Sequence, residues 1–149
     1  MSMATTPKRS VLHPKLLAQL KRHEGLRLML YRDSLGYTTI GYGHNLATPI
    51  STRAADRILR DDAEAAVRAV RRIMPWTSKL IAPRFAVLVD MAFNLGLDGL
   101  RGFVRFLQYA EQGYWDGAAR EMLNSKWATQ VGDRATRLAT QMRAGEWQE

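Results

Sequence analysis

The chain has 149 residues, of which 46% are apolar and 24% are charged, a balance typical of one folded domain. It contains no cysteine, which excludes disulfides, thiolate zinc sites and cysteine nucleophiles. The 22 Lys and Arg against 14 Asp and Glu give a net charge of +8, which favours a polyanionic partner: nucleic acid, anionic lipid or an acidic wall polymer. Neither a signal peptide nor an apolar run of roughly 18 residues is found, so we expect a soluble protein made in the cytoplasm.

The first predicted elements are a tail, a helix and a small β region. Residues 1–9 are polar and are predicted to be a flexible tail. A helix follows, with Pro14 in its first turn and Gly25 as a left-handed cap. Its apolar face is formed by Leu12, Leu16, Leu17 and Leu20. Residues 26–46 combine β-branched and aromatic side chains with turn glycines, which predicts a hairpin or small meander.

The rest of the chain is predicted to be helical. A long helix is predicted with Ser51 or Thr52 as its N-cap; it continues to about Arg72 and is long enough to bridge two lobes. Residues 84–95 are apolar nearly all round, which is typical of a buried central helix, and a turn is expected between Gly96 and Gly99. Shorter helices are predicted near 101–111, 115–123 and 133–143. The predicted fold class is therefore α+β, a small N-terminal β-sheet followed by a larger helical body.

Two acids stand apart in this basic sequence. Glu24 and Asp33 are the only acids in the first fifty residues, and Thr39 follows in the next predicted strand. Glycoside hydrolysis needs two carboxyl groups: one protonates the leaving oxygen, and the other activates water or attacks carbon. The C-terminus of a helix disfavours an anion by about 0.3–1 kcal/mol, which suits Glu24 as the acid, whereas Asp33 beside Arg32 is expected to stay ionised. Position alone favours a plainer alternative, in which Glu24 is a solvated acid at the end of the helix and Asp33 is an acid in a turn.

The stretch from His23 to His44 resembles the active-site region of the bacteriophage lysozymes, endolysins of the muramidase type. Their signature is E-G-x-x-L-x-x-Y-x-D, a short gap, and then G-x-x-T-I-G-x-G-H. The matching residues here are Glu24-Gly25, Leu28, Tyr31, Asp33, Gly36, Thr39-Ile40-Gly41 and Gly43-His44. The similarity covers about residues 15–147. It implies one lysozyme-like domain over 1–149, with lobes of about 15–60 and 61–149 joined by the long helix, and with the N-terminal helix packed on the helical lobe.

The resemblance implies a catalytic role for three residues. Glu24 would be the general acid, Asp33 the carboxylate that positions and activates water, and Thr39 the hydroxyl that holds this water. The cleaved bond would be the β-1,4 bond between N-acetylmuramic acid and N-acetylglucosamine in peptidoglycan, with inversion at the anomeric carbon. No metal or organic cofactor is implied.

The resemblance also implies a supporting set. Arg134 would pair with the catalytic glutamate and His44 with Asp62, while Phe93 and Asn94 would lie on the cleft side of the central helix. Two departures leave partners open: Asp90 stands where the best-known relative has a neutral amide, and His23 where relatives can carry an acid that would face Arg137. Helical context predicts packing rather than sugar stacking for three tryptophans, Trp115, Trp127 and Trp147.

Two alternatives and several partners complete the expectations. A lytic transglycosylase would use the same acid on the same bond, and a non-catalytic cationic protein would bind membranes or wall. The second is motivated by the net charge of +8. An arginine-rich face of the long helix could add such an activity to the enzyme, and it is formed by Arg53, Arg57, Arg60, Arg68 and Arg71. For the lysozyme we expect a monomer that does not bind nucleic acid, accumulates in the host cytoplasm and is released by a separate holin.

Overall fold

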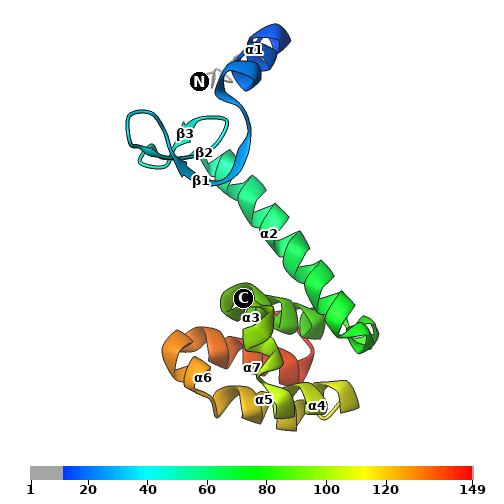
Figure 1. The fold of residues 1–149 in the computed structure, drawn as a ribbon. Helices are drawn as coiled ribbons and strands as arrows, with labels where there is room; N and C mark the ends of the chain where they lie inside the picture. Colours follow the sequence, from blue (N-terminus) through cyan, green and yellow to red (C-terminus); the bar gives the residue numbers. More distant parts are fainter. Residues whose placement is uncertain (1–11, 149) are drawn as a thin grey trace, which may run out of the picture. The chain divides into compact units, whose positions relative to one another are not determined.

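A computed structural model describes residues 12–148, and the predicted tail at 1–9 lies outside them. The chain divides into two compact units, Met1–Ser51 and Thr52–Glu149, and the boundary falls where helix α2 begins. The first unit contains a three-stranded antiparallel sheet and the second is helical, so the predicted α+β class is confirmed (Figure 1). None of the helices between residues 12 and 148 is long and apolar enough to cross a bilayer.

The first unit opens with helix α1, Pro14–Glu24. His13 caps it, since its Nδ1 accepts a hydrogen bond from the Lys15 amide at 3.1 Å, and Pro14 occupies the first turn as predicted. The predicted end at Gly25 is confirmed, but the conformation differs. Gly25 has φ 71° and ψ 157°, a positive-φ conformation open to glycine but outside the left-handed helical region, and β1 begins two residues later.

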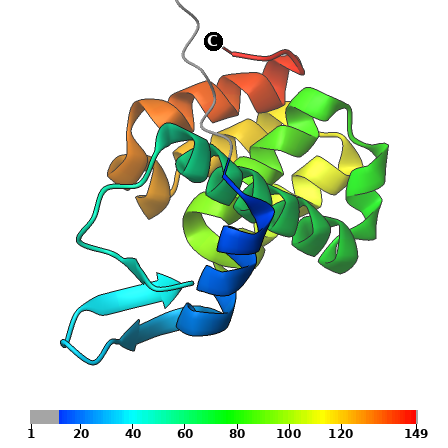
Figure 2. The same cartoon turned by 90° about the horizontal axis from the view of Figure 1, so that it is seen from above.

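The sheet is the small meander that the sequence predicts. It contains β1 (Arg27–Arg32), β2 (Thr38–Gly41) and β3 (His44–Asn45) in the order β1-β2-β3. Figure 2 shows β1 and β2 running antiparallel, and their register sets Tyr31 opposite Thr39. Ile40 pairs with His44 across the next turn. The sheet thereby brings the segments of the signature onto neighbouring strands.

The second unit begins with the long helix α2, Thr52–Ile73, whose bounds match the prediction. A short 3₁₀ helix, η1 (Pro75–Lys79), follows, and then comes the central helix α3, Ala82–Arg101. Gly96, at φ 77° and ψ 162°, interrupts α3 as expected, but the helix resumes through Gly99, where a turn was predicted. The remaining helices are α4 (Val104–Gln112), α5 (Trp115–Leu123), α6 (Lys126–Val131) and α7 (Asp133–Ala144).

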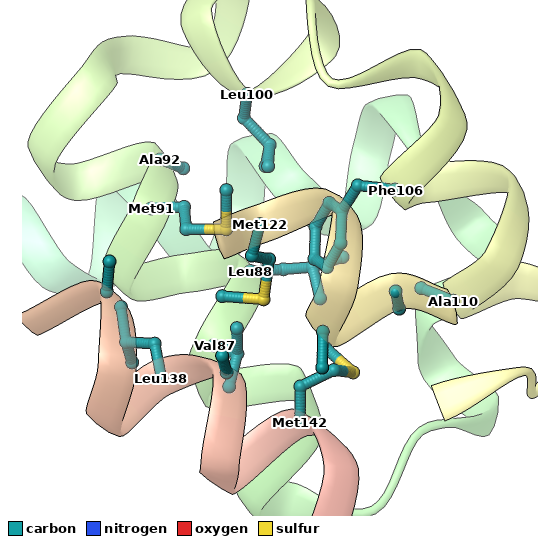
Figure 3. Close-up of a cluster of buried hydrophobic side chains, with 14 of the residues drawn as sticks. Val87, Leu88, Met91, Ala92, Leu100, Phe106, Ala110, Met122, Leu138 and Met142 are labelled. Atoms are coloured by element: carbon teal, nitrogen blue, oxygen red, sulfur yellow. The ribbon is translucent and has the colours of Figure 1, made fainter. Parts of the chain in front are cut away.

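The hydrophobic core lies in the second unit (Figure 3). Leu88 of α3 and Phe106 of α4 are fully buried, and α3, α4, α5 and α7 surround them. Three more fully buried side chains are thioethers, Met91, Met122 and Met142. Burying one such side chain contributes about 1.5–3 kcal/mol to folding, so this core can hold the helices together without any disulfide.

Candidate active site

Glu24 is the last residue of α1, and its carboxyl group lies against the backbone of Gly43. A Cβ added at Gly43 would lie 2.9 Å from Cδ of Glu24 and closer still to Oε2, so no larger residue fits there without displacing the carboxyl group. Gly43 also has φ 72°, a conformation that other residues rarely adopt. The turn between β2 and β3 therefore leaves room for the carboxyl group of Glu24.

Asp33 directly follows β1 and organises the turn to β2. Its Oδ1 accepts hydrogen bonds from the Leu35 amide at 2.9 Å and from the Tyr37 amide at 2.8 Å. Its backbone closes the same turn, since the Asp33 amide donates to the Tyr37 carbonyl at 3.0 Å. Asp33 therefore has the turn-forming role that was the plainer alternative predicted from the sequence. It uses only one carboxylate oxygen, because Oδ2 makes no hydrogen bond within residues 12–148.

Thr39 is the one buried residue of the described sheet, with 2% of its surface exposed. Its hydroxyl donates to the Tyr37 carbonyl at 2.8 Å. A hydroxyl has one proton and two lone pairs, so Oγ1 can still accept hydrogen bonds but cannot donate another. The Tyr37 backbone therefore connects Asp33 and Thr39, since it donates to one side chain and accepts from the other.

His44 occupies the first position of β3 and is half-buried. Its Nε2 is buried and has no hydrogen-bond partner within the described chain. Buried polar atoms are normally paired. Its predicted partner, Asp62, is an exposed residue of α2 in the second unit, and this pairing stays a prediction.

Arg134 and Asp90 form an ion pair inside the second unit. Both Nε and NH2 of Arg134 lie 2.8 Å from Oδ1 of Asp90, and the two side chains are 40% and 39% exposed. The partner of Asp90, which the sequence left open, is therefore this arginine. The predicted pairing of Arg134 with Glu24, which belongs to the first unit, stays a prediction.

The central helix presents Phe93 and Asn94 differently. Asn94 Oδ1 accepts a hydrogen bond from the indole Nε1 of Trp127 at 2.8 Å. Phe93 is 44% exposed and lines a cavity of about 330 Å³ with Leu59, Val89 and the Asp90–Arg134 pair. Whether either residue contacts substrate stays a prediction.

The tryptophans separate into two kinds. Trp127 is 3% exposed and packs edge-on against Phe103 at 5.9 Å between ring centroids, and Trp115 packs against the core, as predicted. The prediction is wrong for Trp147, which is 62% exposed beyond the end of α7. The chain leaves the helix at Gly145 in a left-handed conformation, so Trp147 falls outside the helical packing.

Sequence reasoning missed two contacts. Gly43 is part of the signature, but nothing in one sequence shows that its missing side chain leaves room for Glu24. Likewise, the charge at Asp90 signalled that a partner was needed without identifying which arginine supplies it. Among residues 12–148, no group of three or more His, Asp or Glu side chains could hold a metal ion.

Comparison with known proteins adds to this geometry. The family model described as phage lysozyme matches residues 21–146. The endolysin of Bacillus phage B103 is 35% identical over 115 residues, which cover 72% of this chain and 42% of that protein. The endolysin of Acyrthosiphon pisum secondary endosymbiont phage 1 is 31% identical over 120 residues, covering 76% and 77%. Probable T4-type lysozyme 1 of Dictyostelium discoideum is 26% identical over 157 aligned positions, covering 85% and 92%.

Proposed function

This chain belongs to the phage lysozyme family of glycoside hydrolases, and we propose that it cleaves the β-1,4 bond between N-acetylmuramic acid and N-acetylglucosamine with inversion. Peptidoglycan is the substrate of this family, and two of the relatives are named endolysins. One observation supports the finer assignment: the three signature side chains belong to one unit, in which turns hold two of them and leave room for the third. Gly43 makes room for Glu24, while Tyr37 holds both Asp33 and Thr39.

In the first half of the proposed reaction, Glu24 acts as the general acid. Its proton passes to the glycosidic oxygen as the bond from this oxygen to the anomeric carbon breaks. The leaving group is the 4-hydroxyl of N-acetylglucosamine. Glu24 suits this step because its side chain is exposed, so a substrate can reach the carboxyl group.

In the second half, a water molecule attacks the anomeric carbon from the opposite face. The hydroxyl of Thr39 donates to the Tyr37 carbonyl, so towards this water it can only accept. The water then donates one hydrogen bond to Thr39 and another to Oδ2 of Asp33, and its lone pair is left to attack the carbon, while the proton that faces Thr39 stays on the new hydroxyl group. Asp33 takes up the second proton as the new bond forms, and the attack from the far face gives inversion.

Clearance of purified cell wall tests the acid. We expect Glu24→Gln to lower the rate about 10²–10⁴-fold, because a carboxamide cannot donate the proton. Asp33→Asn should cause a loss of similar size while it keeps the Oδ1 acceptor of the turn. Leu35→Ala, a change at a side chain that is 79% exposed, is the folded control in the same turn. Equal clearance by wild type and Glu24→Gln would end this mechanism.

Product analysis tests the role of water. NMR of the first product should show the α-anomer, and mass spectrometry should show hydrated reducing ends. A lytic transglycosylase would instead leave anhydro ends, because the 6-hydroxyl of the sugar replaces water and only the acid is needed. The free acceptor of Thr39 and the free oxygen of Asp33 favour hydrolysis, since both groups handle water.

The biological setting belongs to the same proposal. We infer that the enzyme is a monomer that waits in the host cytoplasm, reaches the wall through a separate holin and lyses the cell. Lysis that follows co-expression with a holin, and does not follow expression of the enzyme alone, is the expected result. Lysis without a holin would contradict this export route.

A further inference from the structure

The end of α2 and the start of α3 carry an unbalanced positive charge. Between Glu64 and Asp90 the sequence contains no acid but five cations: Arg68, Arg71, Arg72, Lys79 and Arg84. The first half of α2 is different, because its arginines alternate with acids and Arg57 pairs with Asp61 at 3.2 Å. The positive charge of the helix is therefore concentrated in its last two turns.

Arg68 and Arg72 point away from the core. Successive residues of a helix are about 100° apart, so each arginine lies about 160° around the axis from Val70, which is fully buried. Both are exposed and flank a shallow hollow formed by Ala65 and Ala69. These small residues leave the two guanidinium groups free to meet a broad surface.

The neighbouring cations differ in their exposure to solvent. Arg71 is exposed, with its Cζ 5.0 Å from the centroid of the Phe85 ring, and Lys79 is exposed on η1. Arg84 is partly buried, since its Nε donates to the Met142 carbonyl at 2.8 Å and its Cζ lies 4.0 Å from the Trp115 ring centroid. Four cations are therefore available to a partner.

Two exposed isoleucines lie in the same stretch of chain as these cations. Ile73 at the end of α2 is 40% exposed and Ile81 before α3 is 51% exposed. Gly145 lies close to Ile81, so Glu146 is an acid at the edge of this region, and the exposed Trp147 follows it. We call the region the basic corner and define it as Arg68, Arg71, Arg72, Ile73, Lys79 and Ile81.

We propose that the basic corner binds the surface of an anionic lipid bilayer. Cations near such a surface are attracted to its charged headgroups, and exposed isoleucines can enter the boundary between headgroups and acyl chains. A soluble polyanion would neutralise the arginines but offers no apolar layer for Ile73 and Ile81. The combination of charge and apolar surface therefore favours a lipid bilayer over a wall polymer or nucleic acid.

Flotation of the full chain with vesicles tests the proposal. We expect binding to phosphatidylglycerol–phosphatidylcholine vesicles that weakens with salt, and no binding to phosphatidylcholine alone. Arg68→Gln with Arg72→Gln should lower the partition coefficient about 25-fold, since each cation contributes about fivefold. Arg53→Gln with Arg60→Gln removes the same charge from the other half of α2 and should change it less than about twofold. Equal weakening by the two pairs would overturn the proposal.

Further variants separate lipid from other anions and from the enzyme reaction. Ile81→Ser should weaken vesicle binding about fivefold without changing the unfolding midpoint. If the Arg68/Arg72 pair weakened binding to purified wall or duplex DNA but not to vesicles, the lipid assignment would be wrong. Glu24→Gln should float like wild type, and the Arg68/Arg72 variant should clear isolated wall like wild type. Failure of membrane binding and failure of the proposed hydrolysis can therefore be told apart.

Discussion

The two units of the molecule hold their side chains by different means. Every buried apolar side chain in the described part of the chain belongs to the second unit, whereas Thr39 is the one buried residue of residues 12–51. In the second unit the helices are fixed by a packed core. In the first, the side chains of Asp33 and Thr39 are fixed by hydrogen bonds to nearby backbone. Stability and catalysis should therefore respond to mutations in different units.

A matched pair of leucine substitutions gives the largest expected difference. Leu88→Ala removes a fully buried side chain and should lower the free energy of unfolding by about 2.7–5 kcal/mol. Leu35→Ala, at a position 79% exposed in the first unit, should change it by less than about 0.5 kcal/mol. Urea unfolding of both variants provides the measurement. Similar losses would contradict the contrast between the units.

Two glycine substitutions separate backbone strain from displacement of the catalytic acid. Gly43→Ala and Gly41→Ala both place a side chain at positive φ, 72° and 70°, but only the alanine at 43 meets the carboxyl group of Glu24. We expect wall clearance to fall about 100-fold for Gly43→Ala, equivalent to about 2.7 kcal/mol in the barrier. Gly41→Ala should lose a similar amount of stability, but its loss of activity should be at least about tenfold smaller than that of Gly43→Ala. Equal activity losses would remove the positioning role of Gly43.

Thr39 should show a smaller effect, confined to its hydroxyl. Thr39→Val keeps the shape but removes both the bond to the Tyr37 carbonyl and the acceptor for water, and Thr39→Ser restores both. We expect about a tenfold lower clearance rate for valine, equivalent to about 1.4 kcal/mol, and recovery to near wild type for serine. If the valine and serine variants were equally active, Thr39 would have only a packing role.

The smallest effect is expected at the Asp90–Arg134 pair. Its side chains are 39% and 40% exposed, and ion pairs in such settings contribute about 0–1 kcal/mol. Asp90→Asn should therefore change the urea midpoint only slightly. A loss above about 3 kcal/mol would show that the pair behaves as a buried one.

The regular elements were predicted well because each shows either a clear apolar periodicity or turn-forming residues at its ends. Apolar residues at helical spacing defined α2 and the first part of α3, and the glycines around β2 defined the meander. The helix α6 was missed, because six residues span fewer than two turns and show no period. Its one local signal was Ser125, whose hydroxyl accepts from the Ala128 amide at 3.1 Å.

The site was predictable only as a set of residues. The signature identified Glu24, Asp33 and Thr39, but the hydrogen bonds that hold Asp33 and Thr39 depend on the turn geometry around Tyr37. Contacts between positions distant in the sequence could not be predicted, since Arg134 and Asp90 are 44 residues apart and Trp127 and Asn94 are 33 apart. One sequence without aligned relatives contains no record of such pairs.

Oxidation of the core methionines would report how often the helices of the second unit separate. Met91, Met122 and Met142 are fully sealed from solvent, so peroxide can reach their sulfur atoms only while the helices are apart. Sulfoxide formation would then leave a polar group that cannot be repacked among apolar neighbours. In an oxidising medium, a unit that opens and is oxidised would therefore tend not to refold. The lifetime of the protein outside a reducing cell would then depend on how rarely this unit opens.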